Sequence, residues 1–309
     1  MDAFWQKFIS TLRTSSNVTI DVAALCIRSG NVCVLRGGSD AWHTNLCMVE
    51  LIQEVLLKHK LPSAIVQLLP TDRAFVLELL TATAYVDIII PRGSQALIDY
   101  VREHAKVPVI ETGAGVCHSF VERTADIALA AKVVANAKIS RPSVCNALDT
   151  IVIDAAVLSP FLKELAPIFT AHDVRVYADA GSFALLQELG YANLQLAKEA
   201  DFGREFLSLA CSIKVVDDFQ EALAHIRQYS SKHSECILSR DAARIEEFME
   251  TVDAAAVYAN ASTRFTDGGE FGLGAEIGIS TQKLHARGPF ALEKLVTEKW
   301  FVTGEGQIR

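Results

Sequence analysis

The chain has 309 residues with a formal net charge of −8, and 50% of its residues are hydrophobic, which is enough for one large or two ordinary domains with real cores. The acidic balance, without a basic stretch, argues against nucleic acid as a partner. No apolar run approaches the ~20 residues of a membrane helix, and the N-terminus has no continuous apolar segment like that of a secretory signal, so we expect no membrane partner and a cytoplasmic location.

The predicted elements alternate between helices and strands along most of the chain. At the N-terminus, Phe4, Phe8, Ile9 and Leu12 stand at i, i+4, i+5 and i+8, a spacing that predicts a short amphipathic helix. Patterned runs between Gly and Pro residues predict further helices at 21–29, 39–59, 72–83, 94–104, 124–137 and 159–172. The apolar runs between them predict strands at 31–36, 63–69, 86–90, 107–110, 149–154 and 174–179.

This alternation predicts a mostly parallel sheet covered by helices on right-handed crossovers. Because it occurs once before Cys145 and once after, we expect two α/β domains with a boundary between Glu111 and Arg141. Three glycine-bearing loops follow predicted strands, and ligands in such sheets bind at the carboxyl ends of the strands. A single glycine after a strand is often only a turn, but three in succession favour a phosphate-bearing ligand held by backbone N–H groups. These loops are RGGS (36–39), PRGS (91–94) and ETGAG (111–115).

Cys145 stands apart from the other six cysteines because it lies in a polar turn, SRPSVCNALDT (140–150). Seven cysteines at irregular spacing argue against a disulfide framework and for a reducing cytosol, and without a CxxC or HxxxH pattern we expect no metal site. A packed cysteine prefers apolar neighbours, whereas a reactive one needs a stabilised and reachable thiolate. Arg141, four residues away, and a nearby helix N-terminus would each lower the pKa of a thiol. From residue types alone, Cys145 is either an inert cysteine at a domain junction or a nucleophile.

The segment 258–289, YANASTRFTDGGEFGLGAEIGISTQKLHARGP, is rich in polar residues and glycine and could build little core. It is either a long surface loop or a functional segment, since loops of this length in compact domains are usually functional or disordered. Phe265, Phe271, Leu273 and Ile277 supply apolar anchors, so we favour function.

Four stretches together resemble the gamma-glutamyl phosphate reductase family, a branch of the aldehyde dehydrogenase superfamily. They are NVTIDVAALCIRSGNVCVLRGGS (17–39), IIIPRGS (88–94), RPSVCNALDT (141–150) and residues 260–289, and the resemblance runs from about Asn17 to Arg309. It implies an aldehyde-dehydrogenase-like α/β fold. The implied parts are a Rossmann-type NADP-binding domain (1–113), an α/β catalytic domain (114–292) and an oligomerisation strand (293–309).

The resemblance implies an NADP-dependent oxidoreductase that reduces L-glutamate 5-phosphate to L-glutamate 5-semialdehyde and phosphate in proline biosynthesis. Cys145 is the implied nucleophile, which forms a thioester that is then reduced with NADPH. Asn17 falls on the asparagine that binds the oxyanion in the superfamily together with a backbone N–H, although the residue by itself would suit a helix N-cap. We therefore expect a small-molecule substrate and a homo-oligomer, with glutamate 5-kinase as a further partner.

Further site residues follow from the same resemblance. Arg36 ends a predicted strand, and a cation there suits the 2′-phosphate of NADPH. Glu205 either holds the nicotinamide ribose or is only a solvated charge. The implied cofactor-binding residues are Arg36, Gly37, Gly93, Ser94 and Glu205. For the substrate, an arginine fork matches an α-carboxylate. The implied substrate-binding residues are Arg264, Thr266, Asn260 and Ser262, with Arg141 and His118 for the departing phosphate.

Two departures from the family pattern qualify this reading. Glu111 falls where hydrolysing aldehyde dehydrogenases activate water, which a reductase must avoid, so we expect Glu111 to be structural. Family members carry a long segment before NVTID, and residues 1–16 stand in its place here. We therefore expect a truncated cofactor domain in which the strand that leads into Asn17 is missing or is improvised from residues 1–16, and a weak or inactive isolated chain.

Three hypotheses of different classes follow. The chain is a working reductase, a non-catalytic remnant that oligomerises or binds glutamate 5-kinase, or a relative that oxidises aldehydes. The segment STRFTDGGEFGLG (262–274) argues against the last of these.

Overall fold

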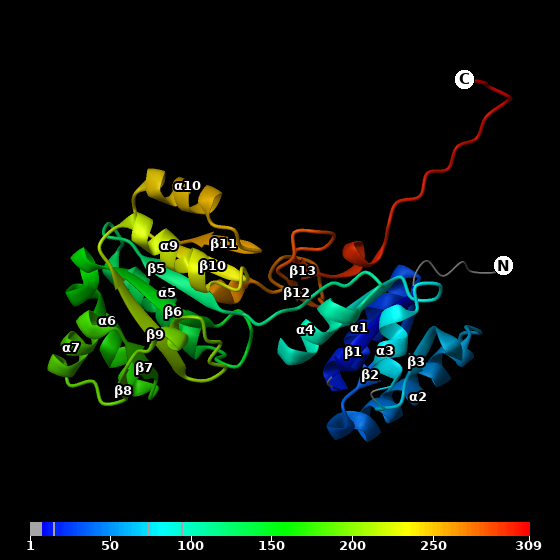
Figure 1. Cartoon of the computed structure of the whole chain (residues 1–309), viewed down its shortest axis with the longest axis horizontal. Coiled ribbons are helices and arrows are strands. Elements are labelled where there is room, and N and C mark those ends of the chain that lie inside the picture. The colour runs from blue at the N-terminus through cyan, green and yellow to red at the C-terminus, as the bar shows by residue number, and fades with distance from the viewer. Residues whose placement is uncertain (1–7, 15, 73, 94) are drawn as a thin grey trace. The chain divides into compact units, whose positions relative to one another are not determined.

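The computed structural model describes residues 8–14, 16–72, 74–93 and 95–309, with the backbone alone for the described residues up to 17 and for Gln95. The chain divides into two compact units, each with its own parallel sheet (Figure 1). The first unit comprises residues 1–110, 275–277 and 290–309, and the second comprises 111–274 and 278–289. The predicted α/β fold class is confirmed.

The first unit is built on a four-stranded sheet with the order β3-β2-β1-β4, in which β1 (Phe8–Thr14) is central. It pairs in parallel with β2 (Val32–Gly37) on one side and β4 (Ile88–Pro91) on the other. The amphipathic helix predicted here is therefore wrong over the residues of β1, and Phe4 lies outside the described residues. Of the two alternatives for the strand that leads into Asn17, β1 excludes a missing strand and leaves an improvised one. The stretch FISTLRT is rich in β-branched residues, and two neighbouring strands offer it a full set of hydrogen bonds that an isolated helix of this length could not sustain.

Two pairs of helices cover this sheet. α1 and α2 pack against each other, as do α3 and α4. The chain moves outward from β1 to β3 and then returns to the far side of β1 at β4, so right-handed crossovers place the two pairs on opposite faces. The strand predicted at 107–110 is reduced to a single bridge between Ile89 and Val109. The other elements of this unit are α1 (Ser16–Ser29), α2 (Trp42–Lys58), β3 (Val66–Leu68), α3 (Ala74–Thr81), α4 (Gln95–His104), and the 3-10 helices η1 (Ser39–Ala41), η2 (Ser63–Ile65) and η5 (Leu292–Leu295).

The second unit is built on a seven-stranded parallel sheet with the order β11-β10-β5-β6-β9-β7-β8. Its strands are β5 (Cys117–Val121), β6 (Leu148–Asp154), β7 (Arg175–Ala178), β8 (Leu194–Leu196), β9 (Ala210–Val216), β10 (Ser234–Leu238) and β11 (Ala256–Ala259). Its α-helices are α5 (Ile127–Ile139), α6 (Leu158–Ala171), α7 (Ala180–Glu188), α8 (Glu199–Phe202), α9 (Phe219–Tyr229) and α10 (Ala242–Thr251). The remaining elements are the 3-10 helices η3 (Ala155–Val157) and η4 (Thr263–Phe265), and the paired strands β12 (Gly278–Ser280) and β13 (Gly288–Phe290).

The core of the second unit lies on both faces of its sheet. On β6, Ile151 and Ile153 pack with α5, α6 and α7, whereas Val152 packs with α9 and α10. Every residue of β6 is buried, as expected for an apolar run in a parallel sheet that is covered on both sides. The strands and helices of this unit are therefore rigid supports for the loops at their ends.

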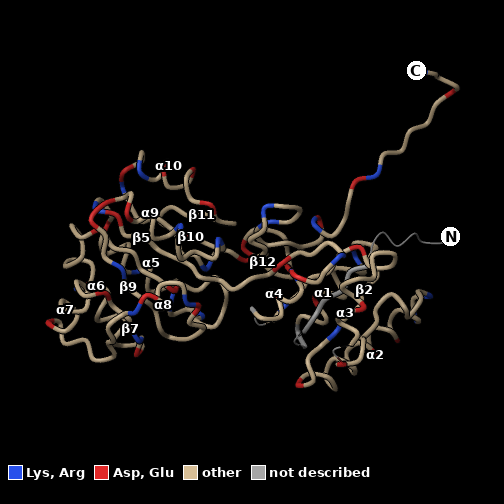
Figure 2. The backbone as a smooth tube through the Cα atoms, viewed as in Figure 1, with Lys and Arg blue, Asp and Glu red and all other residues tan. Residues whose placement is uncertain are grey.

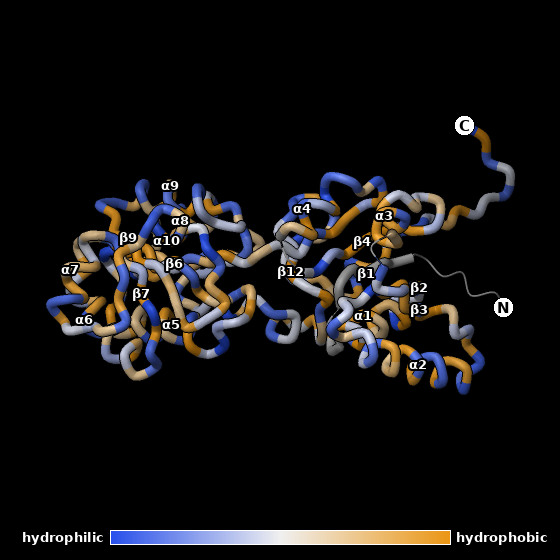
Figure 3. Tube along the Cα trace, turned by 60° about the horizontal axis from the view of Figure 1, so that its bottom comes forward, coloured by the Kyte–Doolittle hydropathy of each residue, from blue (hydrophilic) through white to orange (hydrophobic). Residues whose placement is uncertain are grey.

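Charges of both signs are spread over both units (Figure 2). On α2, hydrophobic and hydrophilic residues alternate (Figure 3), and Leu51, Val55 and Leu57 are more than half exposed. None of the helices in the described ranges is long and apolar enough to span a membrane.

Residues 296–309 form neither a helix nor a strand and run as an extended trace to the C-terminus (Figure 1). Trp300, Phe301 and Val302 in this trace are each more than 80% exposed. Among the residues that the structure describes, no strand pairs with residues 296–309, and the oligomerisation strand predicted at 293–309 stays a prediction.

Candidate active site

Cys145 lies in a turn between the C-terminal end of α5 and the start of β6, and its side chain is partly exposed. The thiols of Cys26, Cys33, Cys117, Cys211 and Cys236 are buried, and Cys47 is exposed. The helix next to Cys145 in the chain presents its C-terminal end, so the predicted helix N-terminus does not come from this neighbour. A thiolate at Cys145 would therefore depend on cations in the turn for its stabilisation.

Loops that precede four adjacent parallel strands come together around Cys145. Gly115 precedes β5, Cys145 precedes β6, Glu205 precedes β9 and Ser231 precedes β10, and the sheet order β10-β5-β6-β9 makes these strands neighbours. Ser231 Oγ accepts a hydrogen bond from the backbone N–H of Val116 at 2.8 Å. The site therefore lies at the amino edge of this sheet. The loop 111–115 follows the bridged segment at Val109, as predicted, and it also leads into β5.

Gly115 allows the closest approach in this site. A Cβ atom at this position would lie 1.8 Å from the carbonyl oxygen of Cys145. The backbone N–H of Gly115 donates to Glu205 Oε1 at 2.9 Å. Burial raises the pKa of Glu205, while this hydrogen bond and the charge of Lys138 oppose the rise. Glu205 is therefore held in the loop beside the cysteine turn and is more than a solvated surface charge.

The thiol of Cys117 forms a hydrogen bond with the same turn. Its Sγ donates to the carbonyl oxygen of Cys145 at 3.3 Å and lies 3.8 Å from His233 Nδ1. Burial, followed by the negative charge of Glu235, raises the pKa of Cys117 well above its usual value. Cys117 is thus a neutral hydrogen-bond donor that holds the Cys145 peptide, which composition alone could not have indicated.

A buried ion pair links α5, β6 and the loop that carries Glu205. Lys138 Nζ lies 3.5 Å from Asp149 Oδ1 and donates to the carbonyl oxygen of Ser208 at 3.2 Å. Asp149 Oδ1 also accepts from the backbone N–H of Phe206 at 3.0 Å. Burial raises the pKa of Asp149 to about 6, although the charge of Lys138 opposes the rise. This pair was not predicted from the sequence, where its signal is a lysine four residues after Val134, on the apolar face of the predicted helix.

Arg264 lies next to the cysteine turn because of Asn146. Its Nη1 donates to Asn146 Oδ1, and its Nε donates to Ser140 Oγ at 3.2 Å. Asn146 Nδ2 donates in return to the carbonyl oxygens of Arg264 and Thr266, at 3.3 and 2.9 Å. The structure thus brings the predicted substrate arginine to the residue that follows Cys145, and it reveals Asn146 as a residue that the sequence analysis did not select.

The three other residues of the predicted substrate set have internal partners. The buried Thr266 hydroxyl is 2.6 Å from Ser234 Oγ and 2.7 Å from Tyr258 OH. Ser262 is buried and caps η4, where its Oγ accepts from the backbone N–H of Arg264 at 3.3 Å. Asn260 follows β11 at the carboxyl edge of the sheet and bonds the backbone of Ser239 in both directions. The carboxyl edge lies at the opposite end of the strands from Cys145, which speaks against a substrate contact, and the role of Asn260 stays a prediction.

His118 and Arg141 were predicted for the departing phosphate. His118 is fully buried on β5, and its Nδ1 lies 3.1 Å from Glu235 Oε2, so it has no route to a ligand at the surface. This burial speaks against a contact with phosphate, and the role of His118 stays a prediction. Arg141 is exposed in the same turn as Cys145, which is compatible with an anion there.

Three of the predicted cofactor residues, Arg36, Gly37 and Gly93, lie at the carboxyl edge of the first unit's own sheet, whereas Glu205 belongs to the second unit. Arg36 and Gly37 end β2, and Arg36 Nη2 donates to the carbonyl oxygen of Thr71 at 2.5 Å. Gly93 follows β4 with a φ of +141°, a conformation that favours glycine. Asn17 lies in the first turn of α1, but its side chain lies outside what the structure describes, as does Ser94 altogether. A helix N-terminus and glycine loops at a carboxyl edge fit the phosphates of a dinucleotide.

Two other features lie apart from this chemistry. Glu111 is partly buried, and its backbone N–H donates to Gln282 Oε1 at 3.0 Å.

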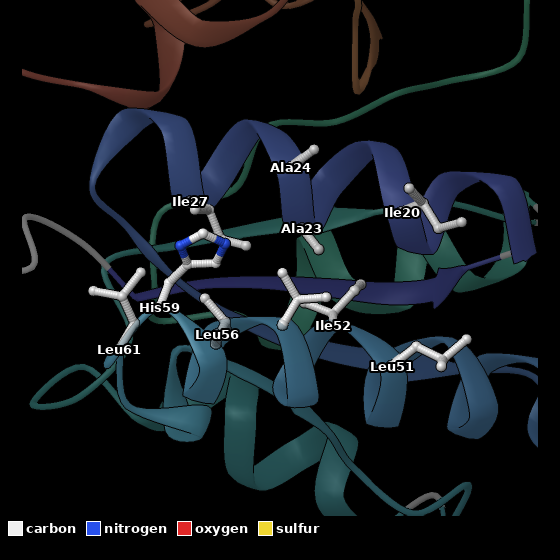
Figure 4. A pocket seen from close by; sticks show the side chains of 10 residues that line it. Ile20, Ala23, Ala24, Ile27, Leu51, Ile52, Leu56, His59 and Leu61 are labelled. Carbon is white, nitrogen blue, oxygen red and sulfur yellow. The ribbon is translucent and has the colours of Figure 1, made fainter.

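An apolar groove of about 390 Å³ runs between α1 and α2 (Figure 4), lined by aliphatic side chains and His59, and it contains none of the predicted site residues. Within the described residues, no group of three or more His, Cys, Asp and Glu side chains could hold a metal ion.

The fold and the sequence define the class of protein. Residues 13–179 match the aldehyde dehydrogenase family, and this match covers more than half of the chain. The chain therefore belongs to the aldehyde dehydrogenase family. An acetylating aldehyde dehydrogenase from Geobacillus thermoglucosidasius, 16% identical over 98% of this chain and 76% of its own, shares the fold with a TM-score of 0.74.

Nearer relatives narrow the class. The gamma-glutamyl phosphate reductase of Chlorobaculum parvum is 53% identical over 294 residues, 95% of this chain and 70% of that protein. That of Legionella pneumophila (strain Lens) is 51% identical over the same shares. The crystal structure of gamma-glutamyl phosphate reductase from Thermotoga maritima, 42% identical, matches 98% of this chain and 72% of its own with a TM-score of 0.92. The chain belongs to the gamma-glutamyl phosphate reductase family, which confirms the resemblance, and it spans about 70% of the length of these relatives.

Proposed function

We propose that this chain reduces L-glutamate 5-phosphate to L-glutamate 5-semialdehyde and phosphate with NADPH, in proline biosynthesis. The observation that carries the proposal is the partly exposed Cys145, held in a polar turn by Gly115, Cys117 and Asn146, in a chain of this family. A thiol in such a turn suits nucleophilic attack, whereas the six other cysteines lack this setting.

Cys145 carries the covalent chemistry in this proposal. Its thiolate attacks the acyl carbon of the substrate, the phosphate leaves with the electron pair of the broken C–O bond, and a thioester remains. Gly115 and Cys117 fix the backbone of Cys145, so its N–H group can serve as an oxyanion donor in a constant position. Asn17 stays the predicted second donor. Glu111, whose backbone is tied to Gln282, is not needed as a base, since hydrolysis of the thioester would waste it.

Cations complete the substrate site. The amino edge of a parallel sheet is also where the C-terminal ends of the covering helices lie, and these ends repel anions. A substrate with an α-carboxylate and a phosphate therefore needs positive side chains there. Arg264, beside Asn146, suits the α-carboxylate, and the exposed Arg141 suits the phosphate.

NADPH, when bound, supplies the hydride that converts the thioester to the aldehyde. The residues of the first unit that would hold it are those at the carboxyl edge of its sheet. Arg36 would face the 2′-phosphate, and Gly37 and Gly93 would let backbone approach the pyrophosphate. Because β1 lies between β2 and β4, the cofactor domain has a strand that leads into Asn17. The weak or absent activity of the isolated chain stays a prediction.

The replacement Cys145→Ser tests the proposal. In the reverse direction, the purified chain should reduce NADP⁺ when given glutamate semialdehyde and phosphate, and the serine variant should not. Cys47→Ser, at an exposed cysteine on α2, is the matched control and should keep the activity. Full activity in the Cys145 variant would exclude the thioester route.

Self-association is a second proposal, which the C-terminal trace supports. Three large apolar side chains, Trp300, Phe301 and Val302, are exposed in an extended segment that could add a strand to a second copy. Sedimentation of the full chain against a Phe301→Glu variant tests it, since the variant should sediment as a smaller species. An unchanged size would contradict the proposed pairing. Binding to glutamate 5-kinase stays the alternative role for a chain that proves inactive.

A further inference from the structure

Asn146 uses its whole side chain to join two turns. It is buried, and its Nδ2 donates to the carbonyl oxygens of Arg264 and Thr266 at 3.3 and 2.9 Å. Its backbone carbonyl oxygen accepts from Thr263 Oγ1 at 2.8 Å. Asn146 thus ties the residue after Cys145 to the turn at 263–266 by side chain and main chain together.

The same side chain orients the guanidinium of Arg264. Nη1 of Arg264 donates to Asn146 Oδ1, and Nε donates to Ser140 Oγ at 3.2 Å. A guanidinium is planar and has five N–H donors, so two fixed donors set the direction of the other three. Among the residues that the structure describes, Nη2 donates to no acceptor, and the side chain is partly exposed.

We propose that Asn146 is a positioning residue that gives the site its specificity for substrates with an α-carboxylate. By accepting from one Nη1 hydrogen of Arg264 while Ser140 accepts from Nε, it leaves Nη2 and the second Nη1 hydrogen for a bidentate pair with a carboxylate. This inference rests on the proposed function, in which Arg264 binds the α-carboxylate. It goes further because it assigns the discrimination to a buried amide that touches no substrate.

Only an amide meets both demands at this position. Two carbonyl oxygens require donors on one end of the side chain, and the guanidinium requires an acceptor on the other. An aspartate would set a carboxylate against the two carbonyl oxygens and would neutralise the charge of Arg264. An alanine would leave the guanidinium held by Ser140 alone.

The test compares two probes, L-glutamate and 4-aminobutyrate, which is the same molecule with the α-carboxylate replaced by hydrogen. Titration calorimetry on the full chain should show L-glutamate binding tenfold or more tightly, because hydrogen bonds to charged groups contribute about 1.5–3 kcal/mol and about 1.4 kcal/mol is a factor of ten. Asn146→Ala and Asn146→Asp should bring the ratio to within about threefold. The rate of Cys145 alkylation should stay close to that of the unmodified chain, which a general disruption of the site would not allow.

Asn193→Ala is the matched control. Asn193 also bonds an arginine and a carbonyl oxygen, with Arg175 Nε donating to its Oδ1 at 3.3 Å and its Nδ2 donating to the carbonyl oxygen of Asp173 at 3.2 Å, but it precedes β8 at the far edge of the sheet. This variant should keep the preference for L-glutamate. Arg264→Lys, which keeps the charge but loses the fork, should lose the preference and does not depend on how the buried Asn146 site tolerates change.

The outcomes distinguish a failure of the role assigned to Asn146 from a failure of the proposed function. If the unmodified chain prefers L-glutamate and the folded Asn146 or Arg264 variants keep that preference, the role of Asn146 is overturned while the proposed function stands. If the unmodified chain shows no preference for L-glutamate, the proposed substrate class fails, and the inference fails with it.

Discussion

The contact between Gly115 and the cysteine turn yields the sharpest prediction. In Gly115→Ala, the new Cβ would lie 1.8 Å from the carbonyl oxygen of Cys145, 2.6 Å from its carbonyl carbon and 2.8 Å from its Cα. Ordinary contact begins near 3.4 Å, so the two backbones must separate by about 1.6 Å. Both stretches lead into buried strands, β5 and β6, so neither can move without disturbing the core. Overpacking of this kind costs about 1–3 kcal/mol.

Two measurements follow from this displacement. The unfolding temperature should fall by several degrees, since about 1 kcal/mol corresponds to roughly 2–4 °C for a unit of this size. Turnover should fall about 100-fold, because a shift of about 1 Å at a reacting group typically has that effect. Gly113→Ala in the same loop is the control, since its Cβ would have Thr281 Oγ1 as nearest atom at 4.0 Å. If Gly115→Ala and Gly113→Ala had the same unfolding temperature and the same turnover, the close contact between Gly115 and Cys145 would not control either property.

Three further predictions concern charge. Glu111→Gln should keep most of the reductase activity, because a reductase gains nothing from a base that activates water against the thioester, and a loss of about 10²–10⁴ in turnover would instead mark Glu111 as a general base. Arg36→Glu should weaken binding of NADPH far more than that of NADH, since a like charge would meet the 2′-phosphate, and equal weakening in a fluorescence titration would show that Arg36 does not contact that group. The buried Asp149 has a pKa of about 6 against an ordinary 3.8, so the folded state binds its proton more tightly than the unfolded chain does. Its contribution to stability is therefore complete below about pH 4 and declines by about 3 kcal/mol as the pH rises through 6, and Asp149→Asn should flatten that slope in urea unfolding; parallel slopes for the two proteins would contradict it.

Local patterns in the sequence were enough to predict the fold class and the family, and they marked Cys145 as the candidate nucleophile. Buried strands of parallel sheets are continuous apolar runs, and Gly and Pro mark their ends, so the α/β alternation could be predicted without any contact. Local sequence also distinguishes Cys145 from the six other cysteines, because its polar surroundings come from its neighbours in the chain. The resemblance to the reductase family rests on stretches of this local kind.

The tertiary structure decided where those pieces meet. The stretch of β1 has a helical spacing of apolar residues, yet it forms a strand because β2 and β4 pair with it from both sides. His118 and Asn260 have polar side chains that suit a binding site, but strand direction buries one and places the other at the edge away from Cys145. Asn146 and Gly115 look ordinary in the chain, and their importance comes from contacts with Arg264, 118 residues away, and with Cys145. The order of strands in a sheet brings such distant residues together, and it depends on the free energy of the whole assembly of strands and helices, which no single segment of sequence contains.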